Sequence, residues 1–218
     1  MGKIYFIRHG ESEMNAMQDS LSPENKIVLG QCNWASLSPE GIEQAKKVGT
    51  YLSKEGVMFD YVTASYAVRT QQTASFVLRE MLDRDNFYKK INNVKLSESL
   101  LERSMGDWDF EPKVNENIVN YQRLLKEDSE TFWKYSPPSG ESYADVSYRV
   151  RKFIEENLFG YETSAVFTHR GCICSFLIDT FKLYPDDIIG LWMGPGSIST
   201  VTFDNKQWKN YKPEIYTP

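Results

Sequence analysis

The sequence has no long apolar run, and this absence limits where the protein can work. Its 218 residues contain no stretch that approaches the roughly 18 consecutive apolar residues needed to span a bilayer, so we expect a soluble protein with no membrane partner. Positive charge is also in short supply, because 25 lysines and arginines face 30 aspartates and glutamates. The net charge of −5 argues against broad binding to nucleic acid or to a membrane surface. An anion must therefore be bound by a local cluster of positive groups.

Cysteine and histidine are scarce as well, which bears on redox state and on metal binding. There are three cysteines, Cys32, Cys172 and Cys174, and two histidines. An odd number of cysteines, after a start that does not resemble a signal peptide, fits reduced thiols in the cytoplasm. Cys172 and Cys174 form a C-x-C pair, but this is half a metal site and no cluster of cysteines or histidines completes it. We expect no metal and no other cofactor.

The remaining sequence alternates short apolar strands with amphipathic helices. Strands are predicted at residues 4–7, 59–65, 94–96, 163–168 and 197–204, and helices at residues 39–55, 68–82, 116–128, 141–159 and 172–184. The helix that begins at Pro39 has Ser38 as its N-cap and Gly56 just past its end. Strands that alternate with helices predict an α/β fold, a three-layer sandwich in which helices flank a mostly parallel central sheet.

We expect a single domain over residues 1–218 with two irregular parts. Residues 16–37 show no sustained period and are predicted to form a long loop, a kind of segment that is often functional or mobile. Residues 107–140, approximately, are polar and aromatic with helical stretches. They are predicted to form a helical insertion that ends in a proline-rich loop.

Both histidines stand at the end of a predicted apolar strand, in "YFIRHG" and "AVFTHRG". Ligands of parallel sheets bind outside the carboxyl ends of the strands, so His9 and His169 share one crevice if their strands are neighbours. Taken alone, a histidine at a strand end is more commonly a capped or solvated group, and a single arginine commonly pairs with a carboxylate. Here Arg8 precedes His9, and Arg69 follows another predicted strand. The four side chains together predict a cationic floor that suits a phosphate.

The residue types at this floor limit the chemistry. The sequence has no Walker lysine loop and no carboxylate cluster for magnesium, so the usual means of using a nucleotide are lacking. The remaining nucleophile is histidine, whose neutral imidazole can attack phosphorus and form a phosphohistidine that water later hydrolyses. Such a reaction also needs an acid that protonates the departing alkoxide.

Several segments resemble a known family. "IRHGESEMN" resembles the R-H-G-[ET]-[ST]-x-x-N signature of the histidine phosphatase superfamily, branch 1, which includes the cofactor-dependent phosphoglycerate mutases and the fructose-2,6-bisphosphatase domain. "LSPEGIEQA", "TASYAVRTQQTA", "LLERSMGDW", "SGESYADVSYRV" and "VFTHRG" resemble later family segments, in the family's order, over most of residues 3–175. The resemblance implies a phosphoglycerate mutase-like fold, a small phosphorylated substrate and a metal-independent reaction.

Carried over position by position, the resemblance implies that His9 is the nucleophile that becomes phosphorylated. Glu102 would be the proton donor to the leaving group. Glu98 is a nearby competitor, but the family's glutamate stands four residues before a glycine, which fits Glu102 and Gly106. The substrate would be bound by Arg8, Asn15, Gly30, Arg69 and His169, and of these Arg8, Arg69 and His169 would also stabilise charge in the transition state.

Three features depart from the family pattern. The connection from Asn15 to Gly30 is longer than the family's, so its extra residues would form a lid or reshape the substrate site. Asp109 stands where the family often has glutamate. Arg170 follows the second histidine, where many relatives have glycine, and it either contacts the substrate or points into solvent.

Three functions are compatible with these residues, and a phosphatase is favoured. Mutases place several extra basic residues after the catalytic glutamate, whereas Lys113, Arg123, Lys126 and Lys134 are the well-separated basic residues of positions 104–140. Arg103, next to Glu102, leans towards the mutases. A phosphate-binding protein without catalysis is the third possibility.

Aromatic residues are the candidates for lining the substrate pocket. They are Trp34, Tyr66, Trp108 and Tyr143. Neither a heptad pattern nor an exposed apolar stripe stands out, so the sequence does not predict an oligomeric state.

Overall fold

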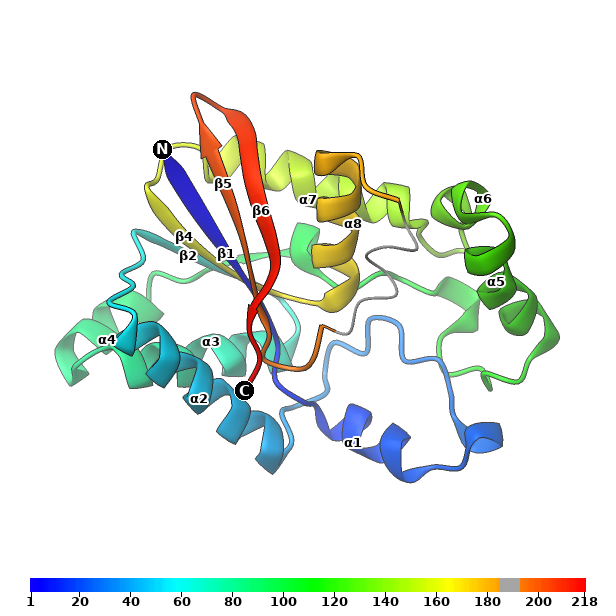
Figure 1. Ribbon diagram of the computed structural model, residues 1–218. Coiled ribbons are helices and arrows are strands. Elements are labelled where there is room, and N and C mark those ends of the chain that lie inside the picture. Colours follow the sequence, from blue (N-terminus) through cyan, green and yellow to red (C-terminus); the bar gives the residue numbers. More distant parts are fainter. Residues whose placement is uncertain (185–192) are drawn as a thin grey trace.

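A six-stranded mixed sheet forms the centre of the computed structural model, which describes residues 1–184 and 193–218 (Figure 1). The strands are β1 (Gly2–Arg8), β2 (Tyr61–Ser65), β3 (Lys95–Ser97), β4 (Thr163–Thr168), β5 (Ile198–Asp204) and β6 (Gln207–Tyr216). Their order is β3-β2-β4-β1-β5-β6. The first four strands pair in parallel, while β5 and β6 are antiparallel to their neighbours. The predicted α/β sandwich with a mostly parallel sheet is confirmed.

Helices cover both faces of this sheet. The helices are α1 (Glu13–Ser20), α2 (Pro39–Lys54), α3 (Val68–Met81), α4 (Arg84–Ile91), α5 (Glu116–Glu127), α6 (Ser129–Lys134), α7 (Tyr143–Asn157) and α8 (Arg170–Phe181). Figure 1 shows α2 and α3 on one side of the sheet and α7 and α8 on the other. Side chains alternate across β1, so that Ile4 and Phe6 enter one core cluster with α7 and α8 while Tyr5 and Ile7 enter the other with α2 and α3.

Local signals explain where the best-predicted helices begin. Ser38 caps α2 by accepting a hydrogen bond from the backbone N–H of Gly41, and Pro39 occupies its first position, as predicted. Ala45, Val48 and Leu52 then bury the apolar face of α2. Ser142 begins α7 with a capping box. These caps define where α2 and α7 begin.

The expected loop at residues 16–37 is wrong in its first part. Residues 16–20 belong to α1, and Pro23–Asn25 form the short 3-10 helix η1. α1 begins with a capping box in which the hydroxyl of Ser12 accepts from the N–H of Asn15 while the Asn15 side chain accepts from the N–H of Ser12. The capping box thus starts a helix at the end of the "RHGESEMN" stretch, and apolar periodicity does not predict this helix.

Two further elements are absent from the predicted set. The helix α4 fully buries none of its eight residues; Phe87 and Ile91 pack partly buried against the core, which is too short an apolar pattern to indicate a helix. The strand β6 follows β5 through a tight turn at Asn205 and Lys206, whose φ angles are 48° and 61°. Because β6 is an edge strand with a proline inside it, its sequence does not read as a strand.

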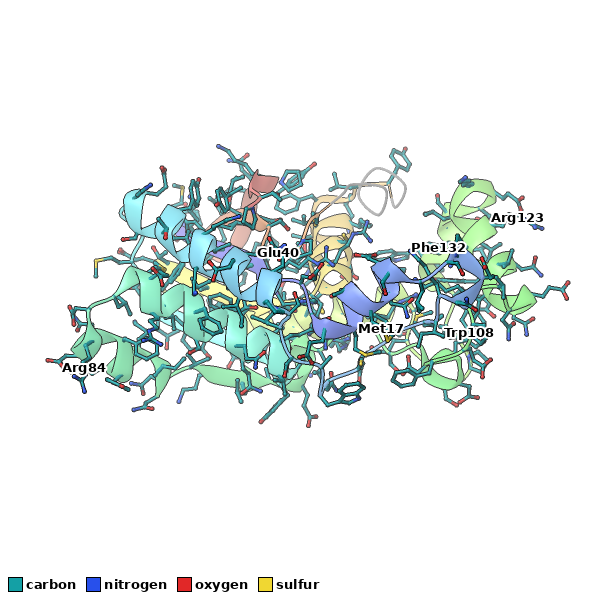
Figure 2. All side chains as sticks on the ribbon, turned by 90° about the horizontal axis from the view of Figure 1, so that it is seen from below. Met17, Glu40, Arg84, Trp108, Arg123 and Phe132 are labelled. Atoms are coloured by element: carbon teal, nitrogen blue, oxygen red, sulfur yellow. The ribbon has the colours of Figure 1, made fainter. Side chains whose placement is uncertain are left out.

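The region at 107–140 is helical as expected and extends to one side of the sheet. It contains α5 and α6, after the short 3-10 helices η2 (Glu98–Leu100) and η3 (Gly106–Trp108). Figure 2 shows Trp108, Arg123 and Phe132 of this region at the opposite end of the molecule from Arg84 of α4. Within the described residues, no helix has both the length and the apolar character needed to cross a membrane.

Candidate active site

A cavity of about 390 Å³ opens beyond the carboxyl ends of β1 and β4, between the sheet and the helical insertion. Six of the seven predicted site residues line it, namely Arg8, His9, Asn15, Gly30, Arg69 and Glu102. The seventh, His169, is fully buried beside them. β1 and β4 are neighbours with Arg8 paired to Thr168, so the residues that follow each strand, His9 and His169, lie side by side. The structure therefore brings together residues that span 160 positions of the chain.

The imidazole of His9 has one proton, and its other nitrogen accepts a hydrogen bond. Its Nδ1 lies 2.7 Å from the carbonyl oxygen of Gly10, which can accept but not donate, so Nδ1 carries the proton. Nε2 accepts a hydrogen bond from Nε of Arg69 at 3.3 Å. Burial, together with the charges of Arg69 and Arg8, holds the pKa of His9 well below its usual value. His9 is therefore a neutral base with its Nε2 lone pair available to an electrophile.

His169 is held by a chain of hydrogen bonds of fixed direction. Its Nδ1 lies 3.2 Å from Nη2 of Arg69, which can donate only, so Nδ1 is the acceptor. Its Nε2 then carries the proton and donates to Oγ of Ser65 at 2.9 Å. Oγ of Ser65 lies 2.8 Å from Oγ1 of Thr70, which in turn donates to the carbonyl oxygen of Ala67 at 2.7 Å. Burial and the neighbouring charges, Arg69 first, hold the pKa of His169 well below its usual value.

Arg69 links both histidines to the loop that precedes α2. Besides its contacts with the two rings, its Nη1 donates to the carbonyl oxygen of Cys32 at 2.7 Å and its Nη2 to that of Gln31 at 3.0 Å. The side chain is almost fully buried at the start of α3. Burial lowers its pKa, and the charge of Glu102 partly offsets this. All of its partners are neutral, so its positive charge stays available to an anion.

Arg8 is a second cation at the same place, and it is partly buried. Burial lowers its pKa to about 10, and Arg170 and Arg69 act in the same direction while Glu102 opposes them. Its guanidinium donates to the carbonyl oxygen of Met193, yet its Nε is buried without a hydrogen-bond partner among the described residues. Within residues 1–184 and 193–218, no carboxylate forms an ion pair with Arg8 or Arg69. Two desolvated cations with an unsatisfied donor are an environment that favours a bound anion.

Glu102 faces these cations from the other wall of the cavity. Its Oε1 accepts from the backbone N–H of Arg103 at 2.8 Å, and its Oε2 from that of Gly171 at 3.3 Å. The carboxylate lies so close to Gly171 that a Cβ at this position would be 2.1 Å from Oε1. The competitor Glu98 is exposed and lies outside the cavity lining. Among the described residues that line the cavity, Glu102 is the one carboxylate, and two backbone donors hold it.

The loop that carries Gly30 is joined to the helical insertion. The backbone N–H of Val28 donates to the carbonyl oxygen of Glu111 at 2.9 Å, and that of Phe110 donates back to Val28 at 2.8 Å. Gly30 has a φ of +45°, and the Asp109 carboxylate lies where its Cβ would be, with Oδ1 1.6 Å from that position. The two segments that depart most from the family pattern therefore contact each other and form one wall of the cavity.

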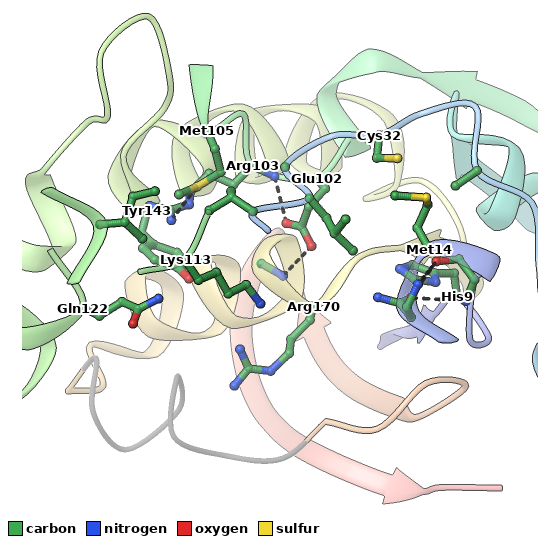
Figure 3. Close-up of a pocket in the computed structure, with 18 of the residues that line it drawn as sticks. His9, Met14, Cys32, Glu102, Arg103, Met105, Lys113, Gln122, Tyr143 and Arg170 are labelled. Carbon is green, nitrogen blue, oxygen red and sulfur yellow. Dashed lines mark hydrogen bonds between the residues drawn. The ribbon is translucent and has the colours of Figure 1, made fainter. Parts of the chain in front are cut away.

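The far end of the cavity is aromatic and cationic. Arg103 donates from Nη1 to the hydroxyl of Tyr121 at 2.6 Å and stacks over the ring of Tyr143, with its Cζ 4.1 Å from the ring centroid. Lys113 and Arg170 also line the cavity, and Figure 3 shows both side chains in the space between His9 and Gln122. Burial and the charge of Lys26 lower the pKa of Lys113. Arg170 therefore lines the cavity.

Of the four aromatic candidates, Tyr143 lines the cavity and the other three do not. Trp34 and Tyr66 are exposed at 63% and 50%. Trp108 is buried among Tyr121 and Tyr135, where it packs the insertion together. Tryptophan and tyrosine serve equally as core residues and as pocket residues, and the sequence around them does not distinguish the two.

Metal ligands are not gathered in the described part of the chain. No group of three or more histidine, cysteine, aspartate or glutamate side chains is placed to hold an ion there. Cys32, Cys172 and Cys174 are all buried, and none of them forms a disulfide bond within the described residues.

The family follows from the comparison with known proteins. The family model of the histidine phosphatase superfamily (branch 1) matches residues 4–213. The chain belongs to this superfamily. The match covers both histidines and the two cationic strand ends, so the predicted family is confirmed.

Relatives within the superfamily include mutases and phosphatases. The chain is 28% identical over 175 residues to the 2,3-bisphosphoglycerate-dependent phosphoglycerate mutase of Treponema denticola, covering 72% of this chain and 67% of the relative. It is 30% identical over 149 residues to the fructose-2,6-bisphosphatase TIGAR of Mus musculus, covering 68% of this chain and 48% of that protein. The fold is similar to the alpha-ribazole phosphatase of Shigella flexneri, with a TM-score of 0.70, 24% identity and coverage of 94% and 93%.

Two residues of this superfamily member were missed from the sequence. Gly171 lies against the carboxylate of Glu102, and a signal for it existed, because it is a glycine two positions after the second histidine. Gln31 contacts both Arg69 and the Glu102 backbone, and no local pattern marks it. Such a residue is found only when segments distant in sequence are placed together.

Proposed function

We propose that the chain is a metal-independent phosphatase that hydrolyses a small phosphomonoester through a phosphohistidine on His9. The observation that carries the proposal is the state of His9: a neutral ring whose unprotonated Nε2 lies against Arg69, with Arg8 beside it and Glu102 across the cavity. A nucleophile, cationic groups and one proton donor are the parts that phosphoryl transfer through a covalent intermediate needs.

The reaction proceeds in two steps. Nε2 of His9 attacks phosphorus, the bond between phosphorus and the ester oxygen breaks, and this oxygen takes a proton from the Glu102 carboxyl group. Water then attacks the phosphohistidine while the Glu102 carboxylate accepts its proton. The bond between phosphorus and Nε2 breaks, and inorganic phosphate leaves with His9 and Glu102 restored.

The remaining site residues bind the transferred group. Arg8 and Arg69 donate to its oxygens, and the unpartnered Nε of Arg8 supplies a donor that no described residue uses. His169 supports Arg69, and the negative charge of a bound phosphoryl group favours a proton on its Nδ1, which then turns from acceptor to donor. Asn15 and Gly30 line the side of the cavity nearest the loop.

A phosphatase is favoured over a mutase by the positions of the basic residues after Glu102. Of the four at positions 104–140, Lys113 lines the cavity, while Arg123, Lys126 and Lys134 are exposed outside it. The mutase remains the second candidate, because Arg103 and Arg170 also line the cavity and several curated relatives are phosphoglycerate mutases. The three buried cysteines, which form no disulfide bond within the described residues, support a cytoplasmic location.

The test uses p-nitrophenyl phosphate in the presence of a chelator, with wild type and His9→Ala. Wild type is expected to release phosphate and to form a labelled phosphoenzyme that is lost in acid and stable in base. His9→Ala is expected to lose both, with activity lower by a factor on the order of 10⁴ or more. Thermal unfolding checks that the variant is folded. Normal turnover by a folded His9→Ala protein would overturn the proposal.

A second assay separates the two candidate enzymes. The chain is supplied with 3-phosphoglycerate and a small amount of 2,3-bisphosphoglycerate. A phosphatase releases inorganic phosphate, whereas a mutase forms the 2-phospho isomer with little phosphate release.

A further inference from the structure

Gln31 joins the two halves of the proposed active site. We propose that Gln31 is a positioning residue, which holds the proton donor Glu102 in register with Arg69, the arginine that binds the phosphoryl group. This role rests on the proposed function. Gln31 is not among the residues that line the cavity, so its effect must pass through the groups it contacts.

The side chain and the backbone of Gln31 contact two different segments of the site. Its side-chain Nε2 donates to the carbonyl oxygen of Glu102 at 3.0 Å. Its own carbonyl oxygen accepts from Nη2 of Arg69, also at 3.0 Å. Gln31 thus connects the start of α3, which carries Arg69, with the segment that carries Glu102 through two hydrogen bonds. Both segments follow Gln31 in the sequence, Arg69 by 38 residues and Glu102 by 71.

The backbone around Gln31 is fixed from both sides, so its contacts are defined. Gly30 and Cys32 both have positive φ angles, 45° and 30°, which turn the carbonyl groups of Gln31 and Cys32 towards Arg69. Asp109 packs against Gly30 from the insertion. The side chain of Gln31 is therefore presented from a rigid turn and not from a free loop.

A second donor keeps the acid segment folded when Gln31 is removed. Nη2 of Arg149 donates to the same Glu102 carbonyl oxygen at 3.3 Å, and Arg149 is itself paired with Glu141 at 2.7 Å. Arg149 also donates to the carbonyl oxygen of Ser99 at 2.8 Å. Loss of the Gln31 amide therefore leaves the segment attached to α7, and it frees Glu102 to shift with respect to Arg69.

A shift of Glu102 can be detected by comparing the rates of substrates that have different leaving groups. An alkyl ester leaves as a strongly basic alkoxide and needs the proton of Glu102, whereas p-nitrophenolate leaves with little help. A displacement of about 1 Å in a catalytic group can cost about 100-fold in rate. Misplacing Glu102 therefore slows alkyl esters far more than aryl esters, while damage to the binding of the phosphoryl group slows both alike.

The experiment compares Gln31→Met, which keeps the length of the side chain and removes its donor, with wild type. The value of kcat/KM is measured for p-nitrophenyl phosphate and for glycerol 2-phosphate, because kcat/KM reports only the steps up to formation of the phosphoenzyme. We expect kcat/KM for the alkyl ester to fall by about 10- to 100-fold and that for the aryl ester to change little. Glu102→Gln is the reference for this pattern, with a larger discrimination.

The matched control is Gln207→Met, which changes an exposed glutamine of β6 and is expected to leave both substrates unaffected. An equal loss for the two esters, or no loss for either, would overturn the role of Gln31. If the wild-type chain hydrolyses neither ester, the proposed function itself fails, and the role of Gln31 fails with it.

Discussion

The rings of His9 and His169 lie 5.1 Å apart, centroid to centroid, with an angle of 63° between their planes. Both are buried, and Arg69 donates a hydrogen bond to a ring nitrogen of each. Each nitrogen that accepts from Arg69 has no proton, so neither ring is charged in the ligand-free site. A pair of neutral imidazoles on adjacent strand ends is therefore built into the fold, and it has consequences for stability as well as for catalysis.

The two histidines should make the stability of the protein fall in mild acid. Their pKa values are lowered from 6.5 in the folded state, so below pH 6.5 the unfolded chain binds protons that the folded chain does not. Their contribution is fully present above pH 6.5 and is lost as the pH falls from 6.5 towards the folded-state values. Below pH 6.5, each histidine lowers the free energy of unfolding by up to about 1.4 kcal/mol for each pH unit.

Urea unfolding at pH 8, 7, 6 and 5.5 measures this dependence. His9→Asn and His169→Asn remove one titrating group each, so both variants should show a flatter dependence between pH 7 and 5.5 than wild type. Carboxylates titrate equally in all three proteins and cancel in the comparison. Parallel curves for wild type and both variants would contradict the buried neutral state.

Lys113 and Arg170 should favour substrates that carry a second negative group. Both line the cavity beyond the proposed phosphoryl position, and Figure 3 places them between His9 and Gln122. A hydrogen bond to a charged group contributes about 1.5–3 kcal/mol, so Lys113→Ala or Arg170→Ala should raise KM for 3-phosphoglycerate about tenfold or more. KM for glycerol 2-phosphate should change little.

The control for this charge effect is Arg123→Ala, which removes a cation from the exposed face of α5. It should leave KM for both substrates unchanged. If Lys113→Ala and Arg170→Ala raise the two KM values by the same factor, the cations act on the transferred phosphoryl group and not on a second anion.

Gly30→Ala should be costly in both stability and substrate binding. An alanine at φ +45° costs about 1–2 kcal/mol, and its Cβ would overlap Oδ1 of Asp109, 1.6 Å away. The displaced turn carries the carbonyl groups that hold Arg69, so KM for p-nitrophenyl phosphate should rise as well. Urea unfolding and steady-state kinetics measure the two effects.

Gly56→Ala is the matched comparison for this substitution. Gly56 has a similar φ of +65° but nothing within 4 Å of its Cβ position, so it reports the backbone cost alone. Gly30→Ala should therefore be the more destabilising of the two, and Asp109→Ala in the same chain should recover part of the difference. Equal costs at the two glycines would show that Asp109 does not restrict the turn.

The parts of the site that could be predicted share one property: they lie at the ends of apolar strands or inside a specific motif. His9 and His169 could be placed together from sequence because the carboxyl ends of neighbouring parallel strands meet at one edge. The spacing of Glu102 from Gly106 separated it from Glu98, and the structure places Glu102 at the cavity. In each case a local pattern carried the information.

The parts that could not be predicted depend on contacts between distant segments. Asp109 meets Gly30, and Gln31 meets Glu102, across about 70 to 80 residues of chain, and neither pair leaves a periodic or compositional trace. The helix α4 and the strand β6 were missed for a local reason, because the apolar residues of each are few and only partly buried. Trp108 was misassigned since an aromatic core residue and an aromatic pocket residue have the same sequence signature.

The position of β1 in the sheet has a consequence for the synthesis of the chain. β1 lies between β4 and β5, so every ladder hydrogen bond of the strand that leads to Arg8 and His9 is made with residues from position 162 onwards. At translation rates of about 5–20 residues per second, these partners leave the ribosome on the order of ten seconds after β1. During that interval β1 has no native neighbour, and the end of this strand, with Arg8 and His9, is among the last parts of the sheet to be assembled.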